Sequence, residues 1–172
     1  VEYRIRDAES LINLNTAPED LLENMAGVGS RAARQIVHRR TGTTRPGEEP
    51  APFQEIEEVR YLDGIRDDDW FGEDGEAGLK DLLTTRGDGR INVNTASRDV
   101  LLSLPGLGKD AVAQLLAIRA GADGELGTRD DQGFDTVTSI IERGGLRGTD
   151  VDAIQRFCKY TSNIFMVQGV AT

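Results

Sequence analysis

One segment of this sequence occurs twice in similar form. Residues 12–29 read INLNTAPEDLLENMAGVG, and residues 91–108 read INVNTASRDVLLSLPGLG. The offset is 79 residues (91 − 12 = 79), and the match continues without a gap to the pair Arg40 and Arg119. Similarity at a fixed spacing is typical of a duplicated structural unit, so the chain is predicted to contain two units of one plan.

Each copy continues in the same order. A polar stretch with glycine comes first, then an apolar-periodic segment that begins at Phe53 or Phe134, and then one more short helix. We expect two units, residues 1–86 and 87–172, that bury their apolar faces against each other in one compact body. The chain ends contain EYRIR and NIFMVQGVAT, which are strand-like. The predicted fold is α+β and predominantly α-helical, with two quasi-repeated helix-hairpin-helix-like units flanked by short strands.

The repeated INxNTA motif combines an extended segment with the start of a helix. INLN and INVN alternate apolar and polar residues, as short strands do. Their asparagines are expected to bond neighbouring backbone, as Asn often does at turns and helix starts. Thr16 is predicted to cap the following helix, with Glu19 completing a capping box and Pro18 in the first turn. In the second copy the predicted cap is Thr95 or Ser97.

A pair of glycines follows in each copy, Gly27 with Gly29 and Gly106 with Gly108. Glycine adopts backbone angles that side chains resist, so each pair predicts a tight turn between two helices. Free N–H groups at the start of the second helix suit a phosphate. The pattern resembles the helix-hairpin-helix motif of DNA-repair proteins and of small competence-type DNA receptors, although the same turn also serves packing alone.

The distribution of charge bears on this DNA-binding alternative. A formal net charge of −10 disfavours a polyanionic partner. The second hairpin offers only Lys109 and Arg119. Because Arg40 and Arg119 are equivalent, we expect them to share a structural task such as bonding carbonyls at a helix C-terminus. The first hairpin carries a basic cluster that either contacts a polyanion or is a solvated helix face: Arg31, Arg34, His38, Arg39, Arg40 and Arg45.

Two segments are rich in carboxylates and glycine, LDGIRDDDWFGEDGE and DGELGTRDDQGFD. Calcium favours dense oxygen ligands on an adaptable backbone, so these segments are candidate calcium loops. Neither matches the EF-hand spacing, and a solvated acidic surface is the alternative. The candidate ligands are Asp67, Asp68, Asp69 and Asp74 in the first segment, and Asp123, Asp130, Asp131 and Asp135 in the second.

Catalytic motifs are missing from the sequence. The single histidine, His38, has Ala117 as its counterpart in the second copy, and no nucleophile elbow, phosphate loop or HExxH is present. The single cysteine, Cys158, lies among apolar neighbours and is expected to be a core thiol. No apolar run is long enough to span a membrane. The chain does not begin with methionine and has strand-like ends, which favours an excised fragment.

A family resemblance combines these features. The doubled INxNTA hairpin, the Phe-led segments and the ending YTSNIFMVQGVA resemble the K-type minor pseudopilins of bacterial type II secretion (general secretion pathway protein K). YRIRDAESLINLNTA looks like that family's strand leading into a helical insert, and TSNIF like the strand by which the chain returns. The competence-receptor alternative explains one copy but neither the long spacers nor the ending.

The resemblance implies a non-enzymatic structural role. Members of the family support protein export from the tip of a periplasmic pseudopilus, together with the I- and J-type pseudopilins. They carry a pilin-like body and an N-terminal helix in the inner membrane, which is absent from this chain, and relatives bind Ca²⁺. The expected function is a pseudopilus-tip subunit, and the alternative is a helix-hairpin-helix DNA-binding protein.

Overall fold

A computed structural model describes residues 2–42 and 47–170. Strands β1 (Glu2–Asp7) and β6 (Phe165–Val170) lie at the two ends, and the 3-10 turn η1 (Ala8–Ser10) follows β1. The first unit contains β2 (Ile12–Asn13), α1 (Glu19–Asn24), α2 (Gly29–Thr41), the 3-10 helix η2 (Ile56–Tyr61), α3 (Asp67–Phe71), α4 (Leu79–Leu82) and β3 (Leu83–Thr84). The second contains β4 (Ile91–Asn92), α5 (Arg98–Leu102), α6 (Lys109–Arg119), α7 (Val137–Glu142), α8 (Thr149–Phe157) and β5 (Cys158–Lys159). The predicted α+β, mainly helical fold is confirmed.

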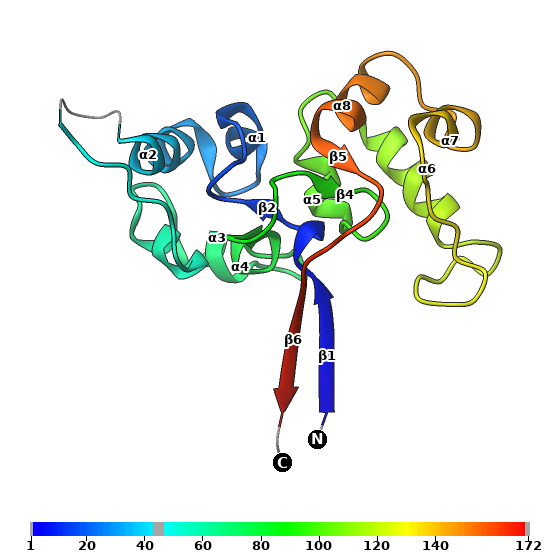
Figure 1. Cartoon of the computed structure of the whole chain (residues 1–172), viewed down its shortest axis with the longest axis horizontal. Coiled ribbons are helices and arrows are strands. Elements are labelled where there is room, and N and C mark those ends of the chain that lie inside the picture. Colours follow the sequence, from blue (N-terminus) through cyan, green and yellow to red (C-terminus); the bar gives the residue numbers. More distant parts are fainter. Residues whose placement is uncertain (1, 43–46, 171–172) are drawn as a thin grey trace.

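The two helical units form two lobes, and a ribbon of β1 and β6 projects from between them (Figure 1). The strands of this ribbon are antiparallel, with Glu2 paired to Val170 and Asp7 paired to Phe165. Both ends of the described chain therefore lie at the far end of the ribbon. The strand-like ends predicted from the sequence are confirmed as β1 and β6, and residues 171 and 172 of the predicted second strand lie outside the described residues.

Each unit is closed by the same two-residue parallel bridge. In the first unit Ile12 pairs with Leu83, and in the second Ile91 pairs with Cys158. The INxNTA motif thus begins each unit, and its isoleucine lies against the segment that ends the unit. The exact boundary between the units near residue 87 stays a prediction.

One continuous hydrophobic cluster includes side chains of both units. Phe53 and Phe134 begin the apolar-periodic segment of each copy, and both are almost completely buried. An arginine covers each ring, with the Arg39 guanidinium 4.1 Å from the Phe53 ring centre and that of Arg143 5.1 Å from Phe134. Cys158 is buried in the same cluster, as predicted.

The second asparagine of each INxNTA motif clamps the backbone of the buried phenylalanine. Asn15 Nδ2 donates to the Phe53 carbonyl at 2.9 Å, and Asn15 Oδ1 accepts from the Phe53 N–H at 2.8 Å. Asn94 makes the same pair with Phe134, both at 2.7 Å, and also donates to the Tyr160 carbonyl. Each clamp joins segments about 40 residues apart, so the expected structural role is confirmed, with more distant partners than predicted.

The first asparagine of each motif bonds locally, as expected. Asn13 Oδ1 accepts from the N–H of Asn15 at 2.9 Å, and Asn92 Oδ1 accepts from that of Asn94 at 3.0 Å. Such Asx turns fix the chain at the end of β2 and of β4. The repeated motif is therefore a structural device that orders the start of each unit.

The paired glycines lie in the turns between the helices, as predicted. Gly27 and Gly106 adopt φ of 81° and 88°, which favour glycine, and Gly29 has φ of 62° at the first residue of α2. Gly108 caps α6 with an ordinary φ of −75°, so its conformation does not require glycine.

The predicted capping box at Thr16 is wrong. Helix α1 begins at Glu19, and the residue before it is Pro18, which has no side-chain acceptor. In the second copy Ser97 occupies the equivalent position, and its Oγ accepts from the Val100 N–H at 3.3 Å, confirming one of the two predicted caps. Helices α1 and α5 therefore begin at equivalent positions of the two copies, Glu19 and Arg98.

Replacing the Asn94 clamp should destabilise the fold. Asn94→Ala leaves the buried Phe134 N–H and carbonyl without their partners, so the free energy of unfolding is expected to fall by about 2 kcal/mol or more. Urea denaturation measures this. The matched control is Asn163→Ala, an exposed asparagine, with an expected change within about 0.5 kcal/mol. Equal stability of the two variants would contradict the clamp.

Candidate functional site

The ribbon exposes one apolar face. The side chains of Tyr3, Ile5 and Val167 are 70%, 72% and 65% exposed, and Phe165 is 55% exposed. Ile5 pairs with Val167, and alternate residues of a strand point to the same side, so these four side chains share a face. Contiguous exposed apolar surface of this kind marks an interaction site.

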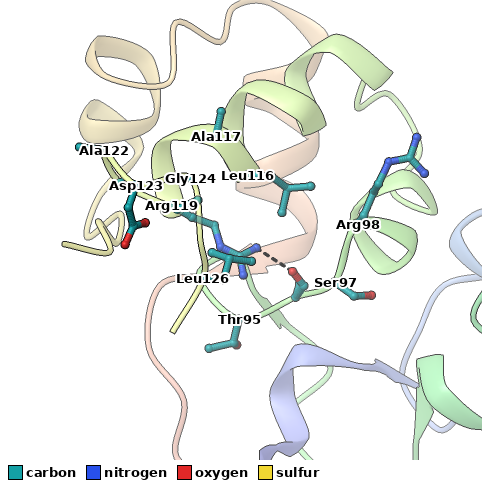
Figure 2. A pocket seen from close by; sticks show the side chains of 13 residues that line it. Thr95, Ser97, Arg98, Leu116, Ala117, Arg119, Ala122, Asp123, Gly124 and Leu126 are labelled. Atoms are coloured by element: carbon teal, nitrogen blue, oxygen red, sulfur yellow. Dashed lines mark hydrogen bonds between the residues drawn. The ribbon is translucent and has the colours of Figure 1, made fainter. Parts of the chain in front are cut away.

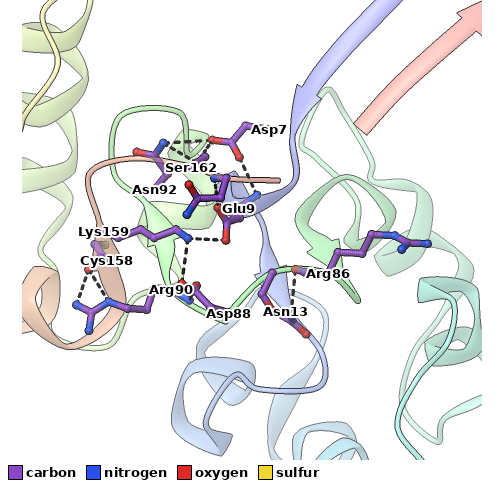
Figure 3. A network of polar contacts seen from close by, with 12 residues as sticks. Asp7, Glu9, Asn13, Arg86, Asp88, Arg90, Asn92, Cys158, Lys159 and Ser162 are labelled. Atoms are coloured by element: carbon purple, nitrogen blue, oxygen red, sulfur yellow. Dashed lines mark hydrogen bonds and ion pairs between the residues drawn. The ribbon is translucent and has the colours of Figure 1, made fainter. Parts of the chain in front are cut away.

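The base of the ribbon is fixed to the second unit through Asp7. Its Oδ1 accepts from the Glu9 N–H at 2.8 Å. Its Oδ2 accepts from Asn92 Nδ2 at 3.2 Å and from Ser162 Oγ at 2.6 Å (Figure 3). The same oxygen accepts from the Thr95 hydroxyl. One carboxylate thus joins the end of β1, the second INxNTA motif and the returning chain before β6.

The buried Glu9 and the half-buried Lys159 form an ion pair beside it (Figure 3). Lys159 Nζ also lies 3.1 Å from Asp88 in the linker between the units, and Glu9 Oε2 accepts from the Asn163 N–H at 2.6 Å. Burial raises the pKa of Glu9, but the bonds from Lys159 and Asn163 outweigh it and hold that pKa below the usual 4.5. Burial likewise opposes the charge of Lys159, yet its two carboxylates raise its pKa. We call Asp7, Glu9, Asp88 and Lys159 the junction network.

The basic cluster of the first hairpin is largely engaged within the protein. Arg31 lies 2.8 Å from Asp63, and Arg39 pairs with Glu58. Arg34 Nε donates to the carbonyl of Ser30, and His38 is exposed on the same helix. Arg45 lies outside the described residues.

Arg40 and Arg119 share a structural task, as predicted, but their acceptors are different from those expected. Arg40 donates to the carbonyls of Leu14 and Ala17, both at 2.5 Å. Arg119 donates to the carbonyl of Ala96, the counterpart of Ala17, at 2.7 Å. Both therefore bond the INxNTA segment at the start of the unit, and neither bonds a helix C-terminus.

A carboxylate lies against the glycine turn of each hairpin. Asp150 Oδ1 accepts from the Gly108 N–H at 2.8 Å. Asp69 lies so close to Gly27 that a Cβ atom added to this glycine would be 2.8 Å from the Asp69 Cβ. A phosphate approaching either turn would meet negative charge at the place where a DNA-binding hairpin presents N–H groups. The geometry of both turns therefore disfavours the DNA-binding alternative.

The first acidic segment is partly helical, which corrects the prediction of a loop. Asp67, Asp68 and Asp69 begin α3, where carboxylates favour the positive end of the helix, and Trp70 anchors the helix in the core. Asp67 lies 3.0 Å from Arg60. Two nitrogens of Arg66 hold Asp69, and these hydrogen bonds lower the pKa of Asp69. Asp74 lies in the turn after α3, with φ of 52°.

The second acidic segment is a loop whose carboxylates bond its own backbone. Asp130 accepts from the Thr128 hydroxyl and from the N–H groups of Ala122 and Asp123, which together lower its pKa to about 2. Asp131 Oδ2 accepts from the Gly127 N–H at 2.7 Å. Asp135 is separate and bonds Thr136 at 3.4 Å.

Neither segment, as placed, fits a calcium site. Across residues 2–42 and 47–170, no group of three or more His, Cys, Asp or Glu side chains converges to hold a metal ion. Calcium needs six to eight oxygens, whereas Asp130 and Asp131 direct oxygens to backbone N–H groups of their own loop. Calcium binding therefore stays a proposal from the sequence.

Comparison with known proteins gives a match among the solved structures. No family model matches the sequence, and no curated protein matches it. A solved structure does match: the crystal structure of the GspK-GspI-GspJ complex from the enterotoxigenic Escherichia coli type 2 secretion system, with a TM-score of 0.56. The chain has the fold expected from the resemblance. Sequence identity is 18%, and the match covers 96% of this chain and 67% of that chain, so it extends over both units.

No helix within the described ranges is long and apolar enough to cross a membrane.

The junction network predicts a specific loss of stability in acid. The Glu9 pKa is lower in the folded state than in the unfolded state, so the stability it contributes is present above pH ~4.5 and is lost as pH falls through the folded pKa. We expect Glu9→Gln to be less stable than the wild type at pH 7 by about 1 to 3 kcal/mol. The difference should shrink as pH falls below ~4.5, measured by urea denaturation from pH 7 to pH 3.

The exposed Glu142→Gln provides the control for this pH series. Its free energy of unfolding should differ little from that of the wild type throughout. A difference between Glu9→Gln and the wild type that stays constant with pH would show that the Glu9 charge contributes nothing.

Calcium binding is tested by thermal unfolding. An ion that binds only the folded state stabilises it by ~2.7 kcal/mol at a hundredfold excess over Kd, and ~1 kcal/mol shifts Tm by ~2 to 4 °C. If the acidic segments bind Ca²⁺ as the sequence proposes, millimolar Ca²⁺ should raise Tm by several degrees relative to chelator, and by more than Mg²⁺ does. Asp130→Asn should abolish the rise if the second segment binds. Equal melting points at matched ionic strength would leave both segments as solvated surface.

Proposed function

We propose that this chain is a non-enzymatic structural subunit of a type II secretion pseudopilus, located at its tip with the I- and J-type minor pseudopilins. The observation that carries the proposal is the projecting β1–β6 ribbon with its exposed apolar face. It belongs to a chain whose fold matches one from the GspK-GspI-GspJ complex. In the family that the sequence resembles, such strands join a pilin-like body.

The ribbon face has the chemistry of a surface that becomes covered. Burying an aliphatic or aromatic side chain of this size contributes about 1.5 to 3 kcal/mol, and the face holds four of them. An isolated two-stranded ribbon is also marginally stable alone and gains from further strands or a packed helix. The ribbon is therefore the element through which the helical units join an assembly.

The titratable side chains with shifted pKa values also support a structural role. Burial raises the pKa of the Cys158 thiol to about 12, which removes it as a nucleophile at neutral pH. Two carboxylates with pKa values lowered to about 2 bond groups of their own chain: Glu58 accepts from backbone N–H groups and Arg39, and Asp130 accepts from the Thr128 hydroxyl and backbone N–H groups. We propose a periplasmic location, as part of a protein anchored in the inner membrane, because the resembled family has one.

The DNA-binding alternative has less support. Asp69 and Asp150 lie against the two glycine turns, and Arg31 and Arg39 are paired with carboxylates. Together with the net charge of −10, these contacts leave little free positive surface at either hairpin.

Complex formation tests the proposal. Mixed with the I- and J-type pseudopilins of the same bacterium, the protein is expected to elute as one ternary complex in size-exclusion chromatography with light scattering. Ile5→Asp introduces a charge into the ribbon face and should weaken this complex at least about tenfold. The matched control is Tyr61→Asp, an apolar side chain that is 88% exposed on the first unit, and it should assemble normally.

Two results would contradict the proposal. One is separate elution of the three folded proteins at micromolar concentration. The other is micromolar binding to duplex DNA at ~0.1 M salt that weakens steeply as salt rises, which would restore the alternative.

A further inference from the structure

A cavity opens at the end of α6, between that helix, the loop that follows it and the second INxNTA motif (Figure 2). Its volume is about 770 Å³, within the range of small-ligand sites. Leu116 and Leu126 supply apolar walls, and Leu126 is 54% exposed at the rim. Thr95 and Ser97 also line the cavity, but their hydroxyl groups already bond Asp7 and the Val100 N–H. The side chain of Arg119 extends into the cavity.

Arg119 is a buried cation with unused donors. Arg119 is only 6% exposed, and its Nη1 donates to the Ala96 carbonyl. Nε is buried and has no partner anywhere in the described chain. No carboxylate within residues 2–42 and 47–170 forms an ion pair with it. Burial lowers the pKa of this guanidinium, and the charge of Asp131 offsets the effect only in part.

The duplication provides an internal comparison. Arg40, the counterpart in the first unit, is only partly buried and uses both terminal nitrogens, one on the carbonyl of Leu14 and one on that of Ala17. Arg119 keeps the bond to Ala96, but no bond to Val93, the counterpart of Leu14, is present. The second unit therefore buries its arginine more deeply and bonds it less completely.

A ligand of defined chemistry would complete this site. A buried cation without a counter-charge is unfavourable, and a carboxylate matches the fork geometry of a guanidinium. The leucine walls suit a short aliphatic stem on that carboxylate. Asp123 also lines the cavity, and its charge repels a doubly charged anion such as phosphate about twice as strongly as a singly charged carboxylate.

We infer that the cavity binds a carboxylate on a short aliphatic stem, with Arg119 as its charged partner and Leu116 and Leu126 against the stem. Two sources carry this chemistry: a free carboxylic acid, and the side chain of an acidic residue on another protein. The inference does not depend on the role in secretion, because it rests on this cavity alone.

Titration with butyrate tests the inference. The probe is added to ¹⁵N-labelled protein at pH 7 and constant ionic strength, and the Arg119 Nε–Hε resonance is followed by NMR. Butyrate should shift this resonance saturably, whereas butyramide, its neutral isostere, should not. A capped peptide containing Glu that binds at least tenfold tighter than butyrate identifies a protein side chain as the ligand, and the reverse order identifies a free acid.

Variants make the test specific. Arg119→Lys should weaken butyrate binding about tenfold or more because the bidentate contact is lost, and Arg40→Lys, its matched control, should leave it unchanged. Ala117→Leu places a larger side chain in the cavity from an exposed position on α6, so it should block butyrate without unfolding the protein. Equal shifts with butyrate and butyramide, or unchanged binding in both Arg119→Lys and Ala117→Leu, would overturn the inference.

Discussion

The arrangement of this protein depends on the ion pair between the buried Glu9 and the half-buried Lys159. Glu9 follows the ribbon strand β1, Lys159 ends the second unit, and Lys159 also contacts Asp88 in the linker between the units. Three parts of the chain that are distant in sequence thus converge on one lysine. Removing one partner of a buried pair leaves an uncompensated charge, so this contact makes the relative positions of the ribbon and the two lobes interdependent.

The duplication explains which side chains do structural work and which are free to differ. The asparagine clamp on a buried phenylalanine and the arginine that bonds the INxNTA carbonyls recur in both units. What differs is the environment of the outer segments: the first unit acquires the additional helix α3, and the second has a longer acidic loop and the cavity at Arg119. The recurring contacts stabilise both units in the same way. The outer segments, which do not carry these contacts, are therefore free to differ between the units.

Local features of the fold were predictable from the sequence, and distant contacts were not. The paired glycines, the short strands and the fold class follow from backbone preferences and from periodicity. The cap at Thr16 was mispredicted because the local Thr-x-x-Glu pattern suggested a start two residues too early. Ser97, which caps the equivalent helix in the second copy, aligns with Pro18 and indicates the correct start. No local rule indicates that Asn94 reaches Phe134, that Asp150 bonds Gly108, or that Arg119 lines a cavity. Each of these contacts depends on how distant segments pack.

The ribbon has a further consequence for any polypeptide that continues beyond it. Residues 2 and 170 are paired neighbours, so their Cα atoms lie about 5 Å apart, as in every antiparallel pair. To a sheet that received the two strands, this whole body would be equivalent to a hairpin loop. A flexible insertion of this length would carry a closure entropy of about 4 to 5 kcal/mol, from 1.5RT ln n. Folding of the lobes already fixes the two strand ends side by side, so the sheet does not lose this entropy again. The lobes therefore replace a single turn of that sheet and leave its strand order unchanged.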